Sequence, residues 1–455
     1  WLDNLKLRVS YGEVGNDGIN SSLWSQNWEA TSDKRYQGAV NGAFLPSYSL
    51  GADMANKDLK WETTITRNIG VDFGFFNSRL TGTIDAYWNT TKDLLMKTAI
   101  PGITGFTSTY ANVGQTSNKG IEIALQGVLV KTRDWNVTAG FNINFNRGKV
   151  DKLADNVTGL YGTEWATSST FPKSDYVLKE GRPVGLVRGL TADGFYTTDD
   201  FTYENGVYTL KEGVADVSSA VFPNYHLHNG MNERPAGQLA YPGMAKFKDL
   251  NDDGIINDDD VDVIGDMTPV HTGGFNINAT YKNFDLGLYF NWSYGNEIYN
   301  VNKLAALYGY KEGAVYENKL SIVKDCYKIY DVVNGELVAL TTPEQLNAAN
   351  ANAKLPLAYS ENGYVSTLGI EDGSYLRLNT LTLGYTLPKS MLQKAGISNL
   401  RVYGSIYNVF TITGYSGIDA EVSTSTSTKT YPQLGMDWGT YPRARSFVLG
   451  VNLSF

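Results

Sequence analysis

The sequence predicts an all-β fold, a transmembrane antiparallel β-barrel, and three observations point to it. Apolar and polar residues alternate over segments long enough to cross a bilayer, short turns alternate with long connections, and the composition favours strands. The 455 residues include 47 Gly and 30 Tyr but only 13 Pro, with 13% aromatic and 19% charged residues. This composition suits many strands rather than helices or disorder.

The segment 135–146, WNVTAGFNINFN, shows the alternation most clearly. Its Trp, Val, Ala, Phe and Ile residues occupy one face, and its Asn, Thr and Gly residues occupy the other. A tilted strand needs roughly 9 to 11 residues to cross a bilayer, and this segment supplies them. The pattern recurs, and it predicts about ten strands, at 5–14, 66–76, 79–95, 117–130, 135–150, 270–282, 284–298, 374–388, 400–412 and 446–455.

The connections between these strands alternate in length. Short turns are expected at 77–78, 131–134 and 283, with a longer one at 389–399. Outer-membrane barrels have short periplasmic turns and long extracellular loops, so the last strand should end on the periplasmic side. The long connections are 15–65, 96–116, 151–269, 299–373 and 413–445.

Residues 341–356 are the one convincing helical stretch in the sequence. Thr342 is placed to cap a helix that begins at Pro343, and the following Ala, Leu, Asn and Gln residues suit a short helix within a loop.

A soluble β-sandwich would also alternate apolar and polar residues. Its solvated face would usually carry Lys, Glu and Thr, whereas the polar faces here are rich in Asn, Gly, Ser and Tyr. A crowded, hydrated barrel interior accounts better for that choice. Aromatic residues near strand ends are also suited to a girdle at the membrane interface, namely Tyr87, Trp88, Trp135, Trp292 and Tyr294.

Charge and cysteine content exclude several classes of protein. The formal net charge is −9 and the pI is near 5.0, so nucleic acid is not an expected partner. Cys326 is the only cysteine, which excludes an intramolecular disulfide, and no zinc-type spacing is present. The sequence contains no phosphate-binding loop, nucleophile elbow or HExxH motif, so we do not expect an enzyme.

The start of the sequence predicts a part of a longer chain. Trp1 leads almost directly into a strand, without a Met, a charged segment or an apolar signal core.

The sharpest local motif is DLNDDGIINDDD at residues 249–260. Oxygen-bearing side chains at positions 1, 3, 5, 9 and 12 and a glycine at position 6 match the calcium-binding loop of the EF-hand. The alternative is a solvated acidic turn. We expect a structural calcium ion, held by the side chains of Asp249, Asn251, Asp253, Asn257 and Asp260 and the carbonyl of Ile255.

Several longer segments, taken together, resemble those of SusC/RagA-type TonB-dependent transporters. They include LKLRVSYGEVGN (5–16), NVGQTSNKGIEIAL (112–125) and YPGMAKFKDLNDDGIINDDDVDVIG (241–265). The most specific lie near the end, and they are SYLRLNTLTLGYTLP (374–388), LRVYGSIYNVFTITGYSGIDAEV (400–422) and YPRARSFVLGVNLSF (441–455).

The resemblance implies that residues 1–455 are the C-terminal part of a barrel of 22 strands in the bacterial outer membrane. A plug and the N-terminal strands would lie in a missing N-terminal polypeptide, and the segment 151–269 would be a long extracellular loop that contains the calcium-type loop. The implied partners are a SusD-like lipoprotein, the TonB energising complex and outer-membrane lipid. A terminal aromatic, here Phe455, would be the signal read by the assembly machinery.

The sequence therefore predicts an importer of oligosaccharides or peptides. A siderophore or metal-chelate receptor of the same fold is the nearest alternative, and a secreted β-rich adhesin or glycan-binding protein is the alternative from another class. Substrate-contacting residues cannot be assigned, because the loop aromatics Tyr161, Trp165, Phe171 and Tyr225 suit both stacking on sugars and packing of the loops.

Overall fold

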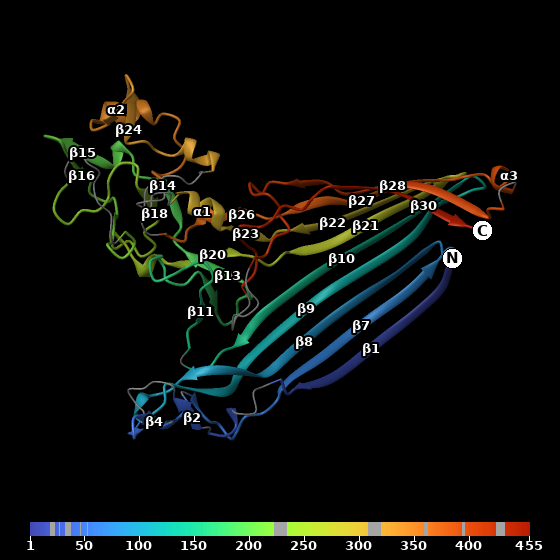
Figure 1. The fold of residues 1–455 in the computed structure, drawn as a ribbon, viewed down its shortest axis with the longest axis horizontal. Helices are drawn as coiled ribbons and strands as arrows, with labels where there is room; N and C mark the ends of the chain where they lie inside the picture. Colours follow the sequence, from blue (N-terminus) through green and yellow to red (C-terminus); the bar gives the residue numbers. More distant parts are fainter. Residues whose placement is uncertain are drawn as a thin grey trace.

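A computed structural model describes the chain except for residues 19–22, 27, 32–37, 46, 52, 156, 223–233, 308–319, 359–362, 394–395 and 425–432. Its main element is a curved antiparallel sheet of long strands (Figure 1). Ten strands follow one another in the order β1-β7-β8-β9-β10-β21-β22-β27-β28-β30, and the short β6 (Asp53–Met54) joins β9. The ten strands are β1 (Leu2–Asn16), β7 (Glu62–Phe75), β8 (Leu80–Ala99), β9 (Ser108–Lys131), β10 (Trp135–Lys152), β21 (His271–Tyr281), β22 (Phe284–Tyr294), β27 (Tyr375–Thr386), β28 (Asn399–Thr413) and β30 (Ser446–Ser454).

All of the predicted strands are confirmed, although several of their ends differ. β8 continues to Ala99 and β9 begins at Ser108, so the connection between them is much shorter than predicted. The predicted strand 284–298 ends at Tyr294, and its last residues belong to the separate strand β23 (Glu297–Asn300). Gly295 has a φ of +76°, a left-handed conformation that breaks the strand at this point.

The two ends of the sheet differ as the connection lengths predict. Both chain termini and the short turns lie at one end, and the long connections lie at the other (Figure 1). We call these the turn end and the loop end. β1 pairs with β7 and β30 pairs with β28, and these two strands form the edges of the sheet.

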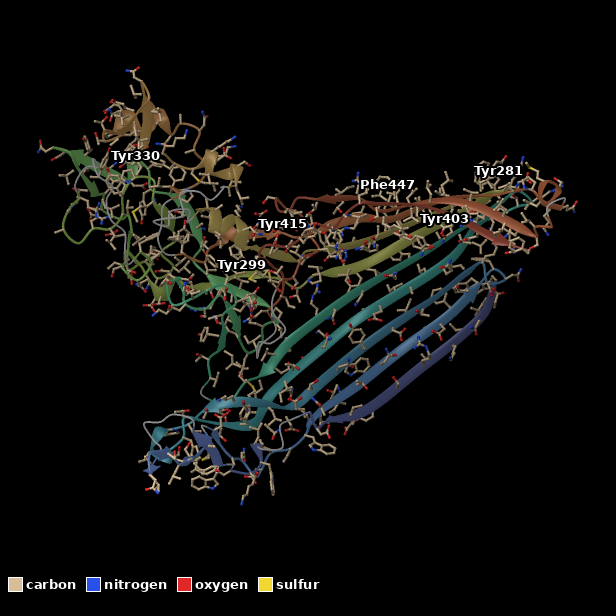
Figure 2. The ribbon with its side chains drawn as sticks, in the orientation of Figure 1. Tyr281, Tyr299, Tyr330, Tyr403, Tyr415 and Phe447 are labelled. Carbon is tan, nitrogen blue, oxygen red and sulfur yellow. The ribbon has the colours of Figure 1, made fainter. Side chains whose placement is uncertain are left out.

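One face of the sheet is apolar, and on β30 it is fully open. Phe447, Leu449, Val451 and Leu453 alternate with smaller or polar residues, and Leu449 is 89% exposed. Figure 2 shows Phe447 on this strand and Tyr281 near the turn end. Leaving such a face in water would be unfavourable at about 25 cal/mol per Å² of apolar surface, so its natural surroundings are hydrocarbon.

The loop end carries a packed body that the sequence did not predict as a unit. The described residues within 160–269 and 297–373, here the loop body, share a core that includes Phe171, Tyr196, Tyr241 and Tyr364. Parallel bridges join the two segments at Phe171–Tyr364 and Leu190–Ser366. Figure 2 shows Tyr299 and Tyr330 here, far from Tyr281. The loop body is therefore a small folded unit rather than a set of independent loops.

Short strands build the loop body and the segments beside it. A sheet of β11 (Leu160–Gly162), β12 (Tyr176–Leu178), β13 (Leu186–Gly189) and β20 (Asp262–Asp266) lies close to β10, and β23 pairs with β26 (Ile370–Asp372) and β29 (Met436–Asp437). The remaining pairs are β14 (Ala192–Phe195) with β18 (Ala245–Phe247), β15 (Phe201–Glu204) with β16 (Val207–Leu210), β17 (Asp216–Val217) with β19 (Ile255–Ile256), β24 (Tyr330–Val333) with β25 (Glu336–Ala339), β2 (Trp28–Thr31) with β5 (Ser47–Leu50), and β3 (Ala39–Val40) with β4 (Ala43–Phe44).

The predicted helix is confirmed in its position but is shorter than expected. α2 spans Pro343–Ala349, and the Thr342 hydroxyl accepts a hydrogen bond from the Gln345 N–H. The prediction that it is the one helical stretch was wrong, because α1 (Val301–Leu307) and α3 (Lys389–Leu392) are also helical. α1 is a short and largely apolar segment. Its sequence pattern therefore cannot be distinguished from that of a buried strand. Among the described residues, no helix is both long and apolar enough to cross a membrane.

Candidate functional site: the polar wall and the acidic loop

The second face of the sheet forms a polar wall that is tied together by charged side chains. The Arg8 guanidinium on β1 lies 2.9 Å from an oxygen of Asp72 on β7 and 2.9 Å from an oxygen of Asp85 on β8. Arg8 crosses β7 above Gly70, where a Cβ atom would lie 2.4 Å from Asp85 Oδ1 and 2.7 Å from Arg8 Nη2. Gly70 therefore leaves the space through which a cation reaches the second strand along.

A similar bridge connects three strands of the polar wall nearer to its opposite edge. Arg401 on β28 forms an ion pair with Asp285 on β22, and the strand between them is β27. A Cβ atom on Gly384 of β27 would lie 2.4 Å from Asp285 Oδ1 and 2.6 Å from Arg401 Nη2. Sequence reasoning missed both bridges, although a charged residue at a polar position of an alternating strand, with a glycine on the next strand, is a visible signal.

Tyr87 also belongs to the polar wall, and its expected place in the interfacial girdle was wrong. Its hydroxyl donates a 2.8 Å hydrogen bond to Asn146 on β10. The ring passes over Gly120 of β9, where a Cβ atom would lie 2.3 Å from the Tyr87 hydroxyl. The strand register places Tyr87 on the face opposite that of its neighbour Trp88, and polar Asn146 attracts it there.

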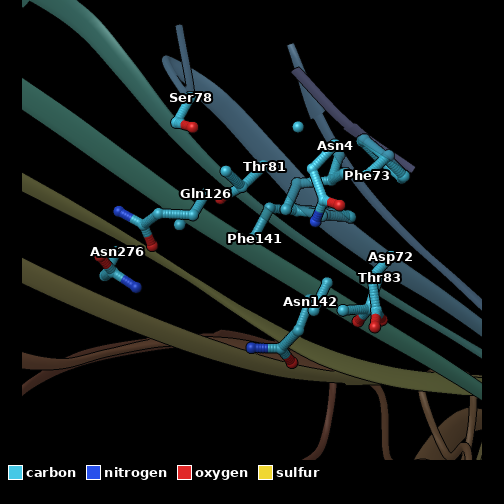
Figure 3. A pocket seen from close by; sticks show the side chains of 15 residues that line it. Asn4, Asp72, Phe73, Ser78, Thr81, Thr83, Gln126, Phe141, Asn142 and Asn276 are labelled. Carbon is cyan, nitrogen blue, oxygen red and sulfur yellow. The ribbon is translucent and has the colours of Figure 1, made fainter. Parts of the chain in front are cut away.

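A shallow hollow of about 480 Å³ lies on the polar wall of β7 to β10 (Figure 3). Amide, hydroxyl and carboxylate groups line it, and they can exchange hydrogen bonds with a hydrated solute or with another polypeptide. The polar side chains that line the hollow are those of Asn4, Asp72, Ser78, Thr81, Thr83, Gln126, Asn142 and Asn276.

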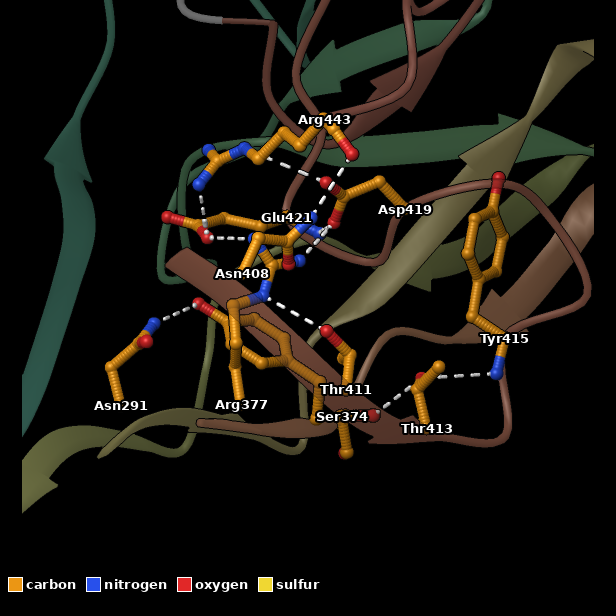
Figure 4. Close-up of polar contacts among 11 residues, drawn as sticks. Asn291, Ser374, Arg377, Asn408, Thr411, Thr413, Tyr415, Asp419, Glu421 and Arg443 are labelled. Atoms are coloured by element: carbon orange, nitrogen blue, oxygen red, sulfur yellow. Dashed lines mark hydrogen bonds and ion pairs between the residues drawn. The ribbon is translucent and has the colours of Figure 1, made fainter. Parts of the chain in front are cut away.

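At the loop end, a buried cation folds the last long connection against the polar wall (Figure 4). Arg377 on β27 is 2% exposed and forms ion pairs with Asp419 and, at 3.1 Å, with Glu421. Arg443 contacts the same two carboxylates, with 2.9 Å to Glu421. The Arg377 Nε atom also donates a 3.0 Å hydrogen bond to the Thr411 hydroxyl. Removing one partner would leave a buried charge unpaired, so the cluster fixes the path of residues 414–424.

Buried carboxylates hold the loop body together. Asp175 is fully buried and accepts hydrogen bonds from the N–H groups of Glu164, Trp165 and Ala166. Burial raises the pKa of Asp175, and these N–H groups oppose that rise. Burial also acts to raise the pKa of Asp200. The Lys246 ammonium at 2.7 Å and the Thr197 N–H and hydroxyl together outweigh burial, so the net pKa is lowered.

The loop aromatics divide between packing and exposure. Phe171 is 6% exposed in the core of the loop body, and Trp165 packs at 6.5 Å between ring centroids against Tyr299. The Tyr161 ring is half exposed and lies beneath the Arg188 guanidinium. Tyr225 lies outside the described residues. Phe171 and Trp165 therefore pack the loops, and Tyr161 alone of the described three is open to a solute.

The acidic loop turns tightly, and its side-chain oxygens accept hydrogen bonds from backbone N–H groups of the same segment. Gly254 has a φ of +84°, and its N–H donates a 2.7 Å hydrogen bond to Asp249. Asp253 accepts from the Ile255 N–H, and Asn251 accepts from the Asp253 N–H. Asp260 is fully buried and accepts from the N–H groups of Leu250 and Asn257.

These oxygens are the hard donors that calcium prefers, so the residues present fit such an ion. No group of three or more His, Cys, Asp or Glu side chains suited to a metal occurs among the described residues. The predicted ligand set also includes Asn side chains and the Ile255 carbonyl, which are not among these four residue types. Calcium at this loop stays a prediction.

Long antiparallel strands with one apolar and one polar face form the wall of a barrel that separates lipid from an aqueous interior. The folded body at one end can cover that interior. The fold and the polar wall thus define the wall of a membrane barrel with a polar inner face.

Comparison with known proteins identifies the family. Residues 1–409 match the model of the TonB dependent receptor-like β-barrel, and the chain belongs to this family. The predicted resemblance to SusC/RagA-type barrels is confirmed, and membership implies an outer-membrane β-barrel.

Named relatives and solved structures agree with this assignment. The chain is 30% identical to TonB-dependent receptor P3 of Formosa agariphila, over 99% of this chain and 39% of that protein. It is 28% identical to TonB-dependent receptor SusC of Bacteroides thetaiotaomicron, over 100% of this chain and 38% of that protein. The structure of the RagAB peptide transporter matches with a TM-score of 0.68 and 24% identity, over 100% of this chain and 41% of that one. The chain thus spans about two fifths of the length of these relatives.

Proposed function

We propose that the protein containing this chain imports oligosaccharides or peptides across the bacterial outer membrane. TonB would energise the import, and a SusD-like lipoprotein would act with it. The observation that carries this proposal is the polar wall, which is lined by Asn, Gln, Thr and Asp side chains and faces away from the lipid-facing side. Such a wall suits large hydrated solutes rather than apolar ones. One protein that shares this fold, RagAB, is a peptide transporter, which is compatible with the peptide class.

In this proposal the turn end is periplasmic and the loop body is extracellular. The loop body would then meet the solute first, and its half-exposed Tyr161, with Arg188 above it, offers a surface for stacking and hydrogen bonding. The remaining strands, the plug and the segment that contacts TonB would come from the part of the relatives that this chain does not match. The polar wall of β7 to β10 would face that plug.

Uptake and fractionation in the source bacterium test the proposal. Deleting the gene should abolish uptake of one class of labelled oligosaccharide or peptide, and so should deleting the gene for the SusD-like lipoprotein. The protein should fractionate with the outer membrane and need detergent for extraction. Uptake that needs a ferric chelate and no lipoprotein would favour a siderophore receptor. Recovery in the soluble fraction without detergent would favour a secreted adhesin.

We also propose that the acidic loop binds a structural calcium ion through Asp249, Asn251, Asp253, Asn257, Asp260 and the Ile255 carbonyl. Its supports are the tight turn at Gly254 and the carboxylate and amide oxygens that this short segment carries. The loop is joined to the loop body through β19, which pairs with β17, and Ile256 is fully buried. An ion there would brace the loop body and would take no part in transport chemistry.

A further inference from the structure

The outward face of β7 to β10 ends in a row of cations at the loop end. Trp88 on β8 lies directly opposite Lys119 on β9, and Lys119 lies directly opposite Arg147 on β10. Directly opposite residues share one face of a sheet. Arg67 on β7 lies beside them, with its Nη1 atom 3.5 Å from the Thr90 hydroxyl of β8. We call Arg67, Trp88, Lys119 and Arg147 the cationic row.

The alternation of the strands shows that this row faces lipid rather than the polar wall. Two residues closer to the turn end, the same face carries Ala86, Ile121 and Phe145. It stays largely apolar as far as Trp135, whose ring packs 4.4 Å from that of Tyr281. By contrast, the carboxylates that form ion pairs with Arg8 and Arg401 lie on the polar wall.

The distance from Trp135 places the cationic row at a membrane interface. Phe145 is ten residues beyond Trp135 on β10, and at ~3.3 Å per residue with a ~45° tilt this rises ~23 Å. The apolar band of such barrels is ~25 Å tall. Lys119 and Arg147 therefore stand at its upper boundary, where lipid headgroups begin. Trp88 is 43% exposed there, as expected of an interfacial aromatic.

Two cations of the row, Lys119 and Arg147, are not neutralised by an ion pair. Within the described part of the chain, no carboxylate forms an ion pair with either of them. The Arg147 Nη1 atom donates to the backbone carbonyls of Pro269 and Val270, at 3.3 and 2.8 Å. These bonds fix the guanidinium in place and leave its charge uncompensated.

The rest of the sheet shows that cations are not a general feature of this boundary. At the loop end of β22, β27 and β28, the outward positions are Trp292, Leu376 and Ile412, which the register places opposite one another. The outward positions of these three strands thus carry no charge at the level of the cationic row. A fixed guanidinium and an exposed ammonium beside an aromatic ring are suited to the oxygens of a phosphate.

We propose that the cationic row binds the phosphate groups of anionic lipid headgroups in the leaflet at the loop end. The inference rests on the proposed insertion of the barrel into a bilayer and does not depend on the solute transported. A phosphate-bearing lipid would then be enriched beside β7 to β10. Zwitterionic lipid would not be enriched there.

The test uses the full-length protein in nanodiscs that contain phosphatidylcholine and a minor fraction of spin-labelled phosphatidic acid. The wild type should prefer the anionic label about fivefold over spin-labelled phosphatidylcholine. The double variant Lys119→Gln, Arg147→Gln should lose most of this preference. A control that removes two charges at the turn end, Arg133→Gln with Lys282→Gln, should retain it. Equal preference in all three proteins would overturn the proposal.

Two further arms identify the ligand and guard against misfolding. Raising the salt from about 0.05 to about 0.5 M should weaken the preference of the wild type. If the preference does not change with salt, the proposal is contradicted, and this result does not depend on whether the double variant folds. Inorganic phosphate at millimolar concentration should leave the preference intact, because a lipid in the bilayer has a high local concentration. Displacement by free phosphate would show that the row is a soluble-anion site instead.

Transport is assayed separately, so loss of uptake with retained lipid preference would count against the proposed function alone.

Discussion

At the scale of single residues, Gly70 controls whether Arg8 can reach across β7. Gly70→Ala would place a methyl group 2.4 Å from Asp85 Oδ1, so the Arg8–Asp85 ion pair must move apart. We expect the unfolding free energy to fall by about 1 kcal/mol, because the added methyl group crowds the side chains that cross above it. Denaturant unfolding of the detergent-solubilised protein measures this.

Gly74→Ala is the matched control for this variant. It lies on the same strand and the same face, and the nearest atom to its added Cβ would be Asn4 Cβ at 3.6 Å. That is an ordinary contact, so the control should be as stable as the wild type. Equal stability of the two variants would mean that the bridge over Gly70 contributes nothing measurable.

Cys326 is expected to be chemically inert in the folded protein. It is 5% exposed, and burial raises its pKa to about 11. At pH 8 the thiolate fraction is then about 10⁻³, and the thiolate is the reactive form. Alkylation followed by mass spectrometry should be slow at pH 8 and rapid after denaturation. Rapid labelling of the native protein would show that this part of the loop body opens readily.

At the scale of elements, the ion pair between Asp200 and Lys246 links the helical turn before β15 to β18. The pKa of Asp200 is lowered in the folded state, so its contribution is complete above the ordinary carboxyl pKa of about 3.9 and is lost as the pH falls through the lowered value. Asp200→Asn should cost about 1 kcal/mol at pH 7, allowing for solvent screening, and less below pH 4.

Hydrogen exchange of the backbone of β18 in the intact protein measures this effect locally. The exposed neighbour Asp199 provides the control, because its backbone carbonyl, and not its carboxylate, accepts the bond from Lys211. Asp199→Asn should leave the protection of β18 and its pH dependence unchanged. The same protection in both variants would mean that the ion pair does not hold β18.

The acidic loop should make stability depend on calcium. At millimolar calcium an ion held with the affinity usual for extracellular modules would stabilise the loop body by about 0.4 to 1.4 kcal/mol. A chelator should therefore lower the melting temperature of the wild type, and Asp249→Ala should abolish the response to added calcium. Asp252→Asn is the control, because Asp252 is not a predicted ligand and Asn tolerates its φ of +58°. A wild type that ignores the chelator would leave the solvated acidic turn as the better interpretation.

The elements of the barrel wall were predictable from sequence, whereas those of the loop body were not. A strand such as β10 faces lipid on one side and polar groups on the other, so its alternation is visible in residues 135–146. The strands of the loop body are short, and Tyr208 and Tyr241 pack there at 5.3 Å between residues distant in sequence. Contacts between residues so far apart in the chain produce no periodic pattern in the sequence. The Arg377 cluster was missed for the same reason, because Asp419 and Glu421 come from another connection.

At the scale of the whole molecule, the sheet has a rigid wall and two open edges. β1 and β30 lie at opposite ends of the strand order, so each presents a row of backbone groups that pairs with no other strand among the described residues. In a bilayer such groups must be satisfied, and further strands of the same barrel would satisfy them. The open edges, the polar wall and the loop body together make this chain one side of a larger enclosure.

Assembly of that enclosure provides the last prediction, which concerns Phe455. It follows β30 in the outward-facing series of Phe447, Leu449, Val451 and Leu453, and it is 86% exposed at the turn end. A strand end that displays an aromatic group toward lipid offers a contact for the insertion machinery. Phe455→Ala should therefore lower the amount of heat-modifiable barrel in the membrane while synthesis is unchanged. Phe447→Ala removes an equally large outward ring from the other end of β30 and should have a smaller effect. Equal losses in the two variants would mean that Phe455 acts only as one more lipid-facing aromatic.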